Sequence, residues 1–508
     1  MKNKSLNENL KIIIMINIKT KISVVLISSV LFININAQDN NGMYFMSMIP
    51  QTNFMNPAIR PSCNFYLGAP VFSSTYLEIN SALSFNNIIY QDTESDSVVL
   101  FLAKKEYQDK FIKKLDKSKN LFGTEMHLTI GSFGFKTGPF YFNFAATTKI
   151  IGDMNLPADF LDFILNGNYI PPATEEGQGT YLNYDLSNFD INLTAYTEIS
   201  AGVSYELNDQ ITVGARPKIL IGLANLSSSD PTAFLNSSSE AISFGANFTV
   251  NSNVPGLTYD EDEDSLYMND NASDQISGNM GFGLDIGGIY KYDEKITAYA
   301  SIVDVGWIKW KSNPNSLNFT SKYDFQGIDV SDILNRDDDD QENEADSGSA
   351  ILDSLKESFD ITNSSLSYRT GLGTKIYLGG TYAIHEKIDL GVLSRSQIYR
   401  GKFRQQLTLS AIFKPLDFIH ATVSYTMKNK SFNNLGYGLS YRFGPFNSYV
   451  IIDKSIAFNL LGRDELVIDG GSFPLPHNFN KYTIRFGANL MFGGTNKKDK
   501  KMDKPIVD

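Results

Sequence analysis

The 508-residue chain has a formal net charge of −12 and only 20% charged residues, whereas 12% of its residues are aromatic and 38 are glycine. This composition favours β structure over long helices, and the acidic balance argues against nucleic acid as a partner. The single cysteine, Cys63, cannot form an internal disulfide, so we expect it to be a small buried hydrophobic residue.

Residues 1–37 have the pattern of a secretory signal peptide. Lys19 and Lys21 precede an apolar run over residues 22–33, and the small residue Ala37 stands before Gln38. The run is shorter than the ~18–20 apolar residues that a membrane-spanning helix requires. We therefore expect the mature chain to begin at Gln38, with either Met1 or Met15 as the initiator. Since this leader carries five lysines and one glutamate, the mature chain should have a net charge near −16.

From residue 74 onward, apolar and polar residues alternate with a period of two, which is typical of β-strands with two different faces. In the longest run, apolar residues from Ile191 to Leu207 alternate with polar residues from Asn192 to Glu206. The pattern predicts fourteen strands, at 74–85, 121–135, 139–151, 188–207, 210–224, 278–292, 295–310, 365–384, 386–397, 402–414, 417–428, 432–443, 446–453 and 481–492.

The connections between these strands alternate between short turns and long loops, an asymmetry typical of outer-membrane barrels. We therefore predict an all-β fold, a closed antiparallel transmembrane β-barrel over residues 74–492 with long outer loops. A closed barrel leaves no unpaired strand edge in the lipid. The alternating stretch 242–250 is then expected in an outer loop, and residues 493–508 form a basic periplasmic tail.

A soluble β-sandwich is the alternative architecture, but two residues argue against it. Arg216 and Lys218 alternate with apolar neighbours in a predicted strand, and charged side chains suit a wet lumen better than a dry core. We expect both to be lumen-facing basic residues. Pro217 lies between them, too deep in the strand for a first residue. Because proline cannot donate to a β-ladder, it predicts a bulge or kink in the wall.

Between the first two strands, residues 100–115 have an apolar stripe at helical spacing on an otherwise basic segment. Such a helix could pair with lipid phosphates or pack as a lid on the loops. Two acidic runs, 260–264 and 337–340, could hold calcium, but we interpret them as solvated loops because the first lacks the ligand spacing of an EF-hand.

The sequence offers little support for catalysis. The four histidines are scattered without a metal-ligand neighbour three or four residues away, and no Gly-x-Ser-x-Gly elbow is present. We therefore expect a non-enzymatic protein without a metal or cofactor.

Several segments resemble a Bacteroidota family of uncharacterised outer-membrane proteins, similar to FadL and PorV barrels. They include residues 43–45, 51–58, 65–68, 214–218, 281–287, 304–310 and 436–440. In FadL-like barrels an Asn-Pro-Ala motif lies in a hatch that plugs the lumen, and Asn56, Pro57 and Ala58 hold the matching place. The resemblance thus implies an N-terminal hatch over residues 38–73.

The same resemblance implies two functions. One is passive, FadL-like transport or capture of a hydrophobic ligand across the cell outer membrane, with Pro217 as the candidate lateral gate. The other is a PorV-like barrel that acts as a partner of secretion or outer-membrane assembly proteins. An apolar pocket behind the hatch would favour transport, whereas a sealed lumen would favour the partner barrel. For both functions we expect the barrel to be surrounded by outer-membrane lipid.

Overall fold

The computed structural model describes residues 41–494, apart from 84–86, 92–97, 118, 168, 171–178, 239–240, 261–264, 269–277, 313, 326–358, 428–433, 454–463, 469–470 and 476–480. The predicted signal peptide, the tail beyond residue 494, the acidic run 337–340 and most of the run 260–264 lie outside this part.

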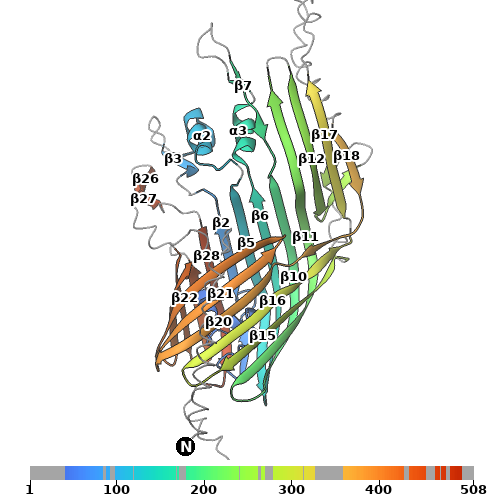
Figure 1. Cartoon of the computed structure of the whole chain (residues 1–508). Helices are drawn as coiled ribbons and strands as arrows, with labels where there is room; N and C mark the ends of the chain where they lie inside the picture. Colours follow the sequence, from blue (N-terminus) through green and yellow to red (C-terminus); the bar gives the residue numbers. More distant parts are fainter. Residues whose placement is uncertain are drawn as a thin grey trace, which may run out of the picture.

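The chain forms a closed, antiparallel, fourteen-strand β-barrel (Figure 1), as the alternation predicts. Two positions in the wall are each shared by two short strands, β1 with β2 and β19 with β20. The last strand closes the barrel by pairing with both β1 and β2. The wall strands are β1 (Phe65–Gly68), β2 (Thr75–Asn80), β5 (Leu121–Thr137), β6 (Phe140–Asn155), β10 (Asp190–Glu206), β11 (Ile211–Ser237), β15 (Met280–Lys291), β16 (Ile296–Trp310), β19 (Tyr368–Gly371), β20 (Thr374–His385), β21 (Ile388–Tyr399), β22 (Lys402–Leu416), β23 (Ile419–Met427), β24 (Leu435–Phe443), β25 (Phe446–Asp453) and β28 (Lys481–Phe492).

The two faces of the wall have the opposite polarity to those of a soluble protein. In β10, Glu198 and Ser200 point inward and are buried, whereas Ile199 between them is 47% exposed on the outside. Large apolar side chains are exposed in the same way on most of the other wall strands. An apolar outer face around a polar interior is the pattern of a barrel in lipid. Among the described residues, no helix is long and apolar enough to cross a membrane.

Short turns join the strands at one end of the barrel, the lower end in Figure 1, and longer connections join them at the other. The stretch expected in an outer loop forms β12 (Ile242–Asn253), which extends the wall upward with the long upper part of β11. It pairs with β17 (Asn315–Phe325), which in turn pairs with β18 (Phe359–Ser364). These strands form a sheet that stands above the rim.

The remaining elements lie in the connections at the long-loop end (Figure 1). The predicted basic helix is shorter than expected, α2 (Lys105–Ile112), and follows the 3-10 turn η4 (Phe101–Ala103). Its Phe111 ring stacks on Phe101 at 3.8 Å, so its apolar stripe packs on the loops. The other elements are α3 (Ala158–Asn166), β9 (Tyr184–Asp185) and four hairpins, β3 (Ile89–Gln91) with β4 (Val98–Leu100), β7 (Tyr169–Ile170) with β8 (Thr180–Tyr181), β13 (Leu257–Asp260) with β14 (Ser265–Met268), and β26 (Asp464–Ile468) with β27 (Gly471–Leu475).

The chain before β1 lies inside the barrel; we call residues 41–64 the inner segment. It contains two 3-10 turns, η1 (Asn41–Met43) and η2 (Pro50–Phe54), and most of its side chains are buried. The expected boundary at residue 73 is wrong, because β1 pairs with β28 and β5 as part of the wall. Phe65 and Leu67 point outward there, so their alternation belongs to a strand.

Candidate functional site

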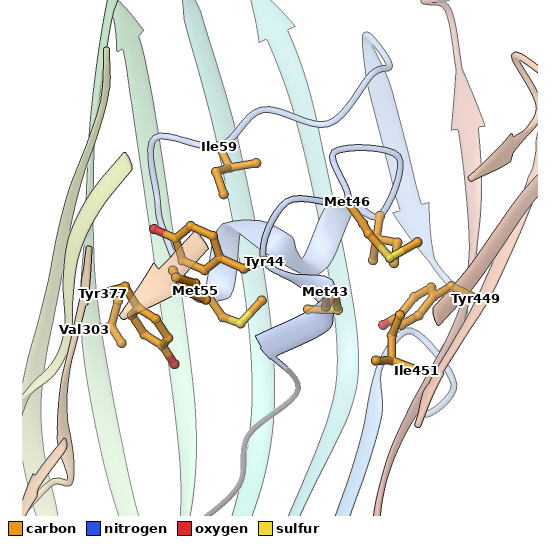
Figure 2. Close-up of a cluster of buried hydrophobic side chains, with 11 residues drawn as sticks. Met43, Tyr44, Met46, Met55, Ile59, Val303, Tyr377, Tyr449 and Ile451 are labelled. Carbon is orange, nitrogen blue, oxygen red and sulfur yellow. The ribbon is translucent and has the colours of Figure 1, made fainter. Parts of the chain in front are cut away.

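The inner segment is held first by an apolar cluster in the barrel interior. Figure 2 shows its methionines and Tyr44 beside wall side chains from several strands. Tyr44 stacks on Tyr377 with ring centroids 5.3 Å apart, and its hydroxyl lies 3.3 Å from the Ser301 hydroxyl. The buried members of the cluster are Met43, Tyr44, Met46, Ile49, Met55, Ile59, Val303, Tyr377, Leu393, Tyr449 and Ile451.

The Asn56-Pro57-Ala58 motif lies against the wall strands β11, β15 and β16. The Asn56 amide nitrogen donates to the main-chain carbonyls of Gly288, at 3.4 Å, and Ala300, at 3.3 Å. The Asn56 side-chain oxygen accepts from the Ala58 N–H at 3.0 Å, which closes a local turn. The motif is fully buried. The side chain of Asn56 thus forms hydrogen bonds both to the wall and within the turn.

A second set of contacts joins the inner segment to charged side chains of the wall. Arg216 points inward from β11, and its guanidinium lies 5.0 Å from the Phe54 ring and 3.4 Å from the Asn53 side-chain oxygen. It also donates twice to Asp285 of β15, at 2.9 and 2.7 Å. Both side chains are essentially unexposed. Arg216 therefore points into the lumen, where it forms a buried ion pair with Asp285.

Lys218 continues this network away from the inner segment. Its ammonium lies 2.8 Å from Asp285 and 2.6 Å from Asp304 of β16. Asp304 in turn lies within 3.4 Å of Lys149 and 3.5 Å of Lys375. We call these residues, with Arg216, Glu125 and Glu198, the charged layer. It contains four acidic and four basic groups, so its formal charges balance.

A bulge in β16 places Asp304 at the centre of this layer. The register between β15 and β16 shifts between Leu284 and Ile286, and Asp304 has a φ of +59°. The Asp304 N–H donates to Asp285 at 2.7 Å. Alternation in the sequence does not identify Asp304 as a lumen residue, because it shows neither the pairing register nor the bulges of a strand. The available signal was that acidic residues interrupt apolar strands at 285 and 304.

Two small cavities adjoin the charged layer. A cavity of about 70 Å³ opens on the long-loop side and is lined by charged groups that include Lys149, Lys375 and Arg404. Another, of about 50 Å³, lies between the layer and Phe54. A larger apolar hollow of about 1340 Å³ lies on the outer face, where its lining residues Leu378, Val392 and Phe403 are exposed. Both lumen cavities are thus lined by charged and apolar groups together, unlike the apolar pocket expected for transport.

The bulge expected at Pro217 is not observed. The register of β11 with β15 runs without a shift through Pro217 and Leu284. On the other side, β10 keeps one register from Ser200 to Val203, while Ala201 and Gly202 have no paired residue within these two described strands. The missing N–H of proline is tolerated by a local gap in pairing, without an inserted residue. The shift in this strand pair occurs instead near Gly222 and Ala224.

The described residues offer few candidate groups for metal binding or catalysis. Within the described residues, no cluster of three His, Cys, Asp or Glu side chains is placed to hold a metal ion. His127 lies 2.7 Å from Glu125 in the charged layer, and His477 falls outside the described part. Cys63 is buried among Tyr66, Tyr141 and Met491, as expected for a small hydrophobic residue.

Comparison with known proteins gives structural neighbours and a family. Similar solved structures are a TodX monoaromatic hydrocarbon channel with a deltaS2S3 mutation (11% identity, 87% of this chain and 94% of that chain, TM-score 0.40), a FadL homologue of Pseudomonas aeruginosa (11%, 87% and 94%, 0.39) and the toluene transporter TbuX of Ralstonia pickettii (7%, 87% and 93%, 0.37). Structural similarity at this level does not identify a ligand for this chain. No curated protein matches the chain. Residues 57–453, most of the sequence, match the family of unknown function DUF5723, and the chain belongs to this family.

Proposed function

We propose that the protein is a passive transport barrel of the outer membrane, with the inner segment as its hatch. The observation that carries this proposal is the position of the segment, whose buried side chains occupy the lumen between opposite walls. Tyr44 and Met55 contact β16 and β20, while η1 lies near β22 to β25. These hydrogen bonds and apolar contacts can break without a chemical step, so movement of the segment would open a path.

The walls of that path favour a hydrophobic ligand with a charged head group. Displacing the inner segment would expose apolar wall side chains that it now covers, which include Tyr377, Leu393 and Ile451. The methionines that face them are flexible and adapt to different shapes. Above this level, the cavity at the mouth is lined by basic groups and by carboxylates. Lys149 is paired with Glu198 and Asp304, whereas the buried Nε of Arg404 has no hydrogen-bond partner among the described residues. A long-chain carboxylate has the chemistry that both levels would recognise, its carboxylate near the basic groups and its tail along the apolar wall.

A pair of neutralising variants tests the proposal. In cells that express the full-length protein, we expect uptake of radiolabelled oleate above the level of an empty vector. Arg404→Gln should lower this uptake, because Arg404 lines the mouth cavity. Lys402→Gln removes a charge two residues away on the same strand, outside the cavity lining, and should leave uptake unchanged. Oleate uptake equal to that of the empty vector would reject the proposal.

We infer that Pro217 marks the exit from the lumen toward the lipid. The supporting observation is that Ala201 and Gly202 of β10, which pair with β6, have no paired residue on the β11 side, so fewer backbone hydrogen bonds would have to break between β10 and β11. Pro217→Val restores a hydrogen-bond donor. We expect normal membrane insertion with reduced oleate uptake, whereas unchanged uptake would reduce Pro217 to a local irregularity.

A second function, as a partner barrel for secretion or assembly proteins, is favoured by the sheet above the rim. In the described part of this sheet, β18 pairs with β17 alone, so one edge is available for another strand. Deleting the gene in the native host separates the two functions. Transport predicts lower oleate uptake with unchanged secreted proteins, and the partner function predicts the reverse.

A further inference from the structure

Two wall glycines lie directly opposite each other where the Asn56-Pro57-Ala58 motif touches the barrel. Gly214 of β11 pairs with Gly287 of β15. A Cβ atom on Gly287 would lie 2.1 Å from the Asn56 side-chain oxygen. A Cβ atom on Gly214 would lie 2.4 Å from both the Pro57 carbonyl carbon and its oxygen. Any side chain at either position would collide with the motif.

The backbone does not explain these glycines. Neither Gly214 nor Gly287 has a positive φ, so any residue could adopt its conformation. Glycine inside a strand is otherwise unfavourable, because it loses more conformational freedom than other residues and packs no side chain. It often marks a place where another backbone approaches closely. Here the approaching backbone is that of Pro57 and Ala58.

The hydrogen bonds of Asn56 depend on this approach. Its amide reaches the carbonyls of Gly288 and Ala300 at 3.4 and 3.3 Å, close to the limit of a hydrogen bond. A shift of the motif away from the wall by the width of a methyl group would therefore break both. The same amide donates to the Tyr44 hydroxyl at 3.1 Å, so the effect would reach the apolar cluster.

We propose that Gly214 and Gly287 form a notch that holds the inner segment in its closed position, and that withdrawal of Asn56 and Pro57 from this notch opens the barrel. The notch acts on the hatch of the proposed function and names the wall residues that control it. It makes no claim about the ligand. Withdrawal from the notch breaks the Asn56 hydrogen bonds and the close backbone contact without a chemical step. A bound ligand or a partner could supply the free energy for this and for the loss of the apolar contacts of the segment.

Two wall glycines provide a matched experiment, with potassium chloride current through the full-length protein in planar bilayers as the readout. Gly287→Ala adds a methyl group that would collide with Asn56 and should raise the mean current about tenfold or more over wild type. Gly131→Ala adds the same group on β5, where no described atom lies within 4 Å of the new Cβ, and should conduct like wild type. Gly214→Ala should act like Gly287→Ala.

Asn56→Ala tests the same contact without adding a side chain to the wall. It removes the hydrogen bonds and should also raise the current. Because the Gly287→Ala collision is mainly with Asn56, the double variant Asn56→Ala/Gly287→Ala should conduct about as much as Asn56→Ala alone. A folded barrel is confirmed for each variant by its shift in gel mobility on heating.

Wild-type current in both Gly287→Ala and Asn56→Ala would overturn the notch, as would equal current in Gly287→Ala and Gly131→Ala. Failure of the proposed function gives a different result. The notch variants would then conduct potassium chloride while oleate uptake stays at the level of the empty vector.

Discussion

Individual charged residues in this barrel depend on one another because they are buried together. Arg216, Lys218 and Asp285 have side-chain exposures of 0–1%. A buried charge that loses its partner is strongly destabilising, whereas an exposed pair contributes little. Asp285 neutralises two cations and accepts the Asp304 N–H, so it is the residue on which the charged layer most depends.

Asp285→Asn should therefore lower the free energy of unfolding by about 3–5 kcal/mol, because it leaves Arg216 and Lys218 partly unpaired in a dry interior. The measurement is the urea midpoint at which the unheated, faster-migrating gel band disappears. Asp389→Asn is the control, since Asp389 pairs with Lys414, whose side chain is 34% exposed. We expect at most about 1 kcal/mol there. Equal midpoints for the two variants would contradict the buried character of the layer.

The lone thiol reports on the inner segment without any mutation. Burial raises the pKa of Cys63 to about 11. Because the reactive species is the thiolate, very little of it is present at pH 7.5, and the side chain is also only 4% exposed. Cys63 should thus resist a maleimide in the folded protein and react fully in urea, as seen by the mass of the intact chain. Rapid labelling of the folded protein would show that the segment leaves its place often.

At the scale of elements, alternation in the sequence predicts the positions of the wall strands but not the register and bulges of their pairing. Alternation located all fourteen wall positions because each strand separates lipid from lumen on opposite faces. It missed β1, a four-residue strand too short to show a period, and the bulge at Asp304. Alternation in the sequence led us to expect Arg216 and Lys218 in the lumen, but it could not identify Asp285 and Asp304. The positions of these two residues follow from register, which depends on long-range pairing.

The last strand closes the barrel, so it should matter for assembly. Phe492 pairs with Phe65 and its side chain is 48% exposed on the outer face. We predict that Phe492→Ala lowers the inserted fraction, because insertion machinery reads an amphipathic terminal strand with an aromatic end. Truncation of residues 495–508 should leave insertion intact, since β28 ends before them. If the truncation abolishes insertion while Phe492→Ala does not, the assignment of the signal is wrong.

For the whole molecule, the polarity of the two faces requires a membrane. Exposed residues such as Leu378, Leu409 and Leu439 lie on strands around the wall, and water would meet this surface in a soluble protein. We therefore predict that the protein fractionates with the outer membrane and shifts in gel mobility on heating. Recovery from the soluble periplasm would contradict the outward orientation of these side chains.

The central claim is that the inner segment keeps the barrel closed, and deletion of residues 43–58 tests it most directly. The deletion removes five of the eleven buried members of the cluster and the Asn56-Pro57-Ala58 motif while leaving β1 to β28 in the chain. In planar bilayers, the full-length protein should remain mostly closed, and the deletion variant should carry a large, steady potassium chloride current. An inserted, heat-modifiable deletion variant that conducts no more than the full-length protein would contradict the claim.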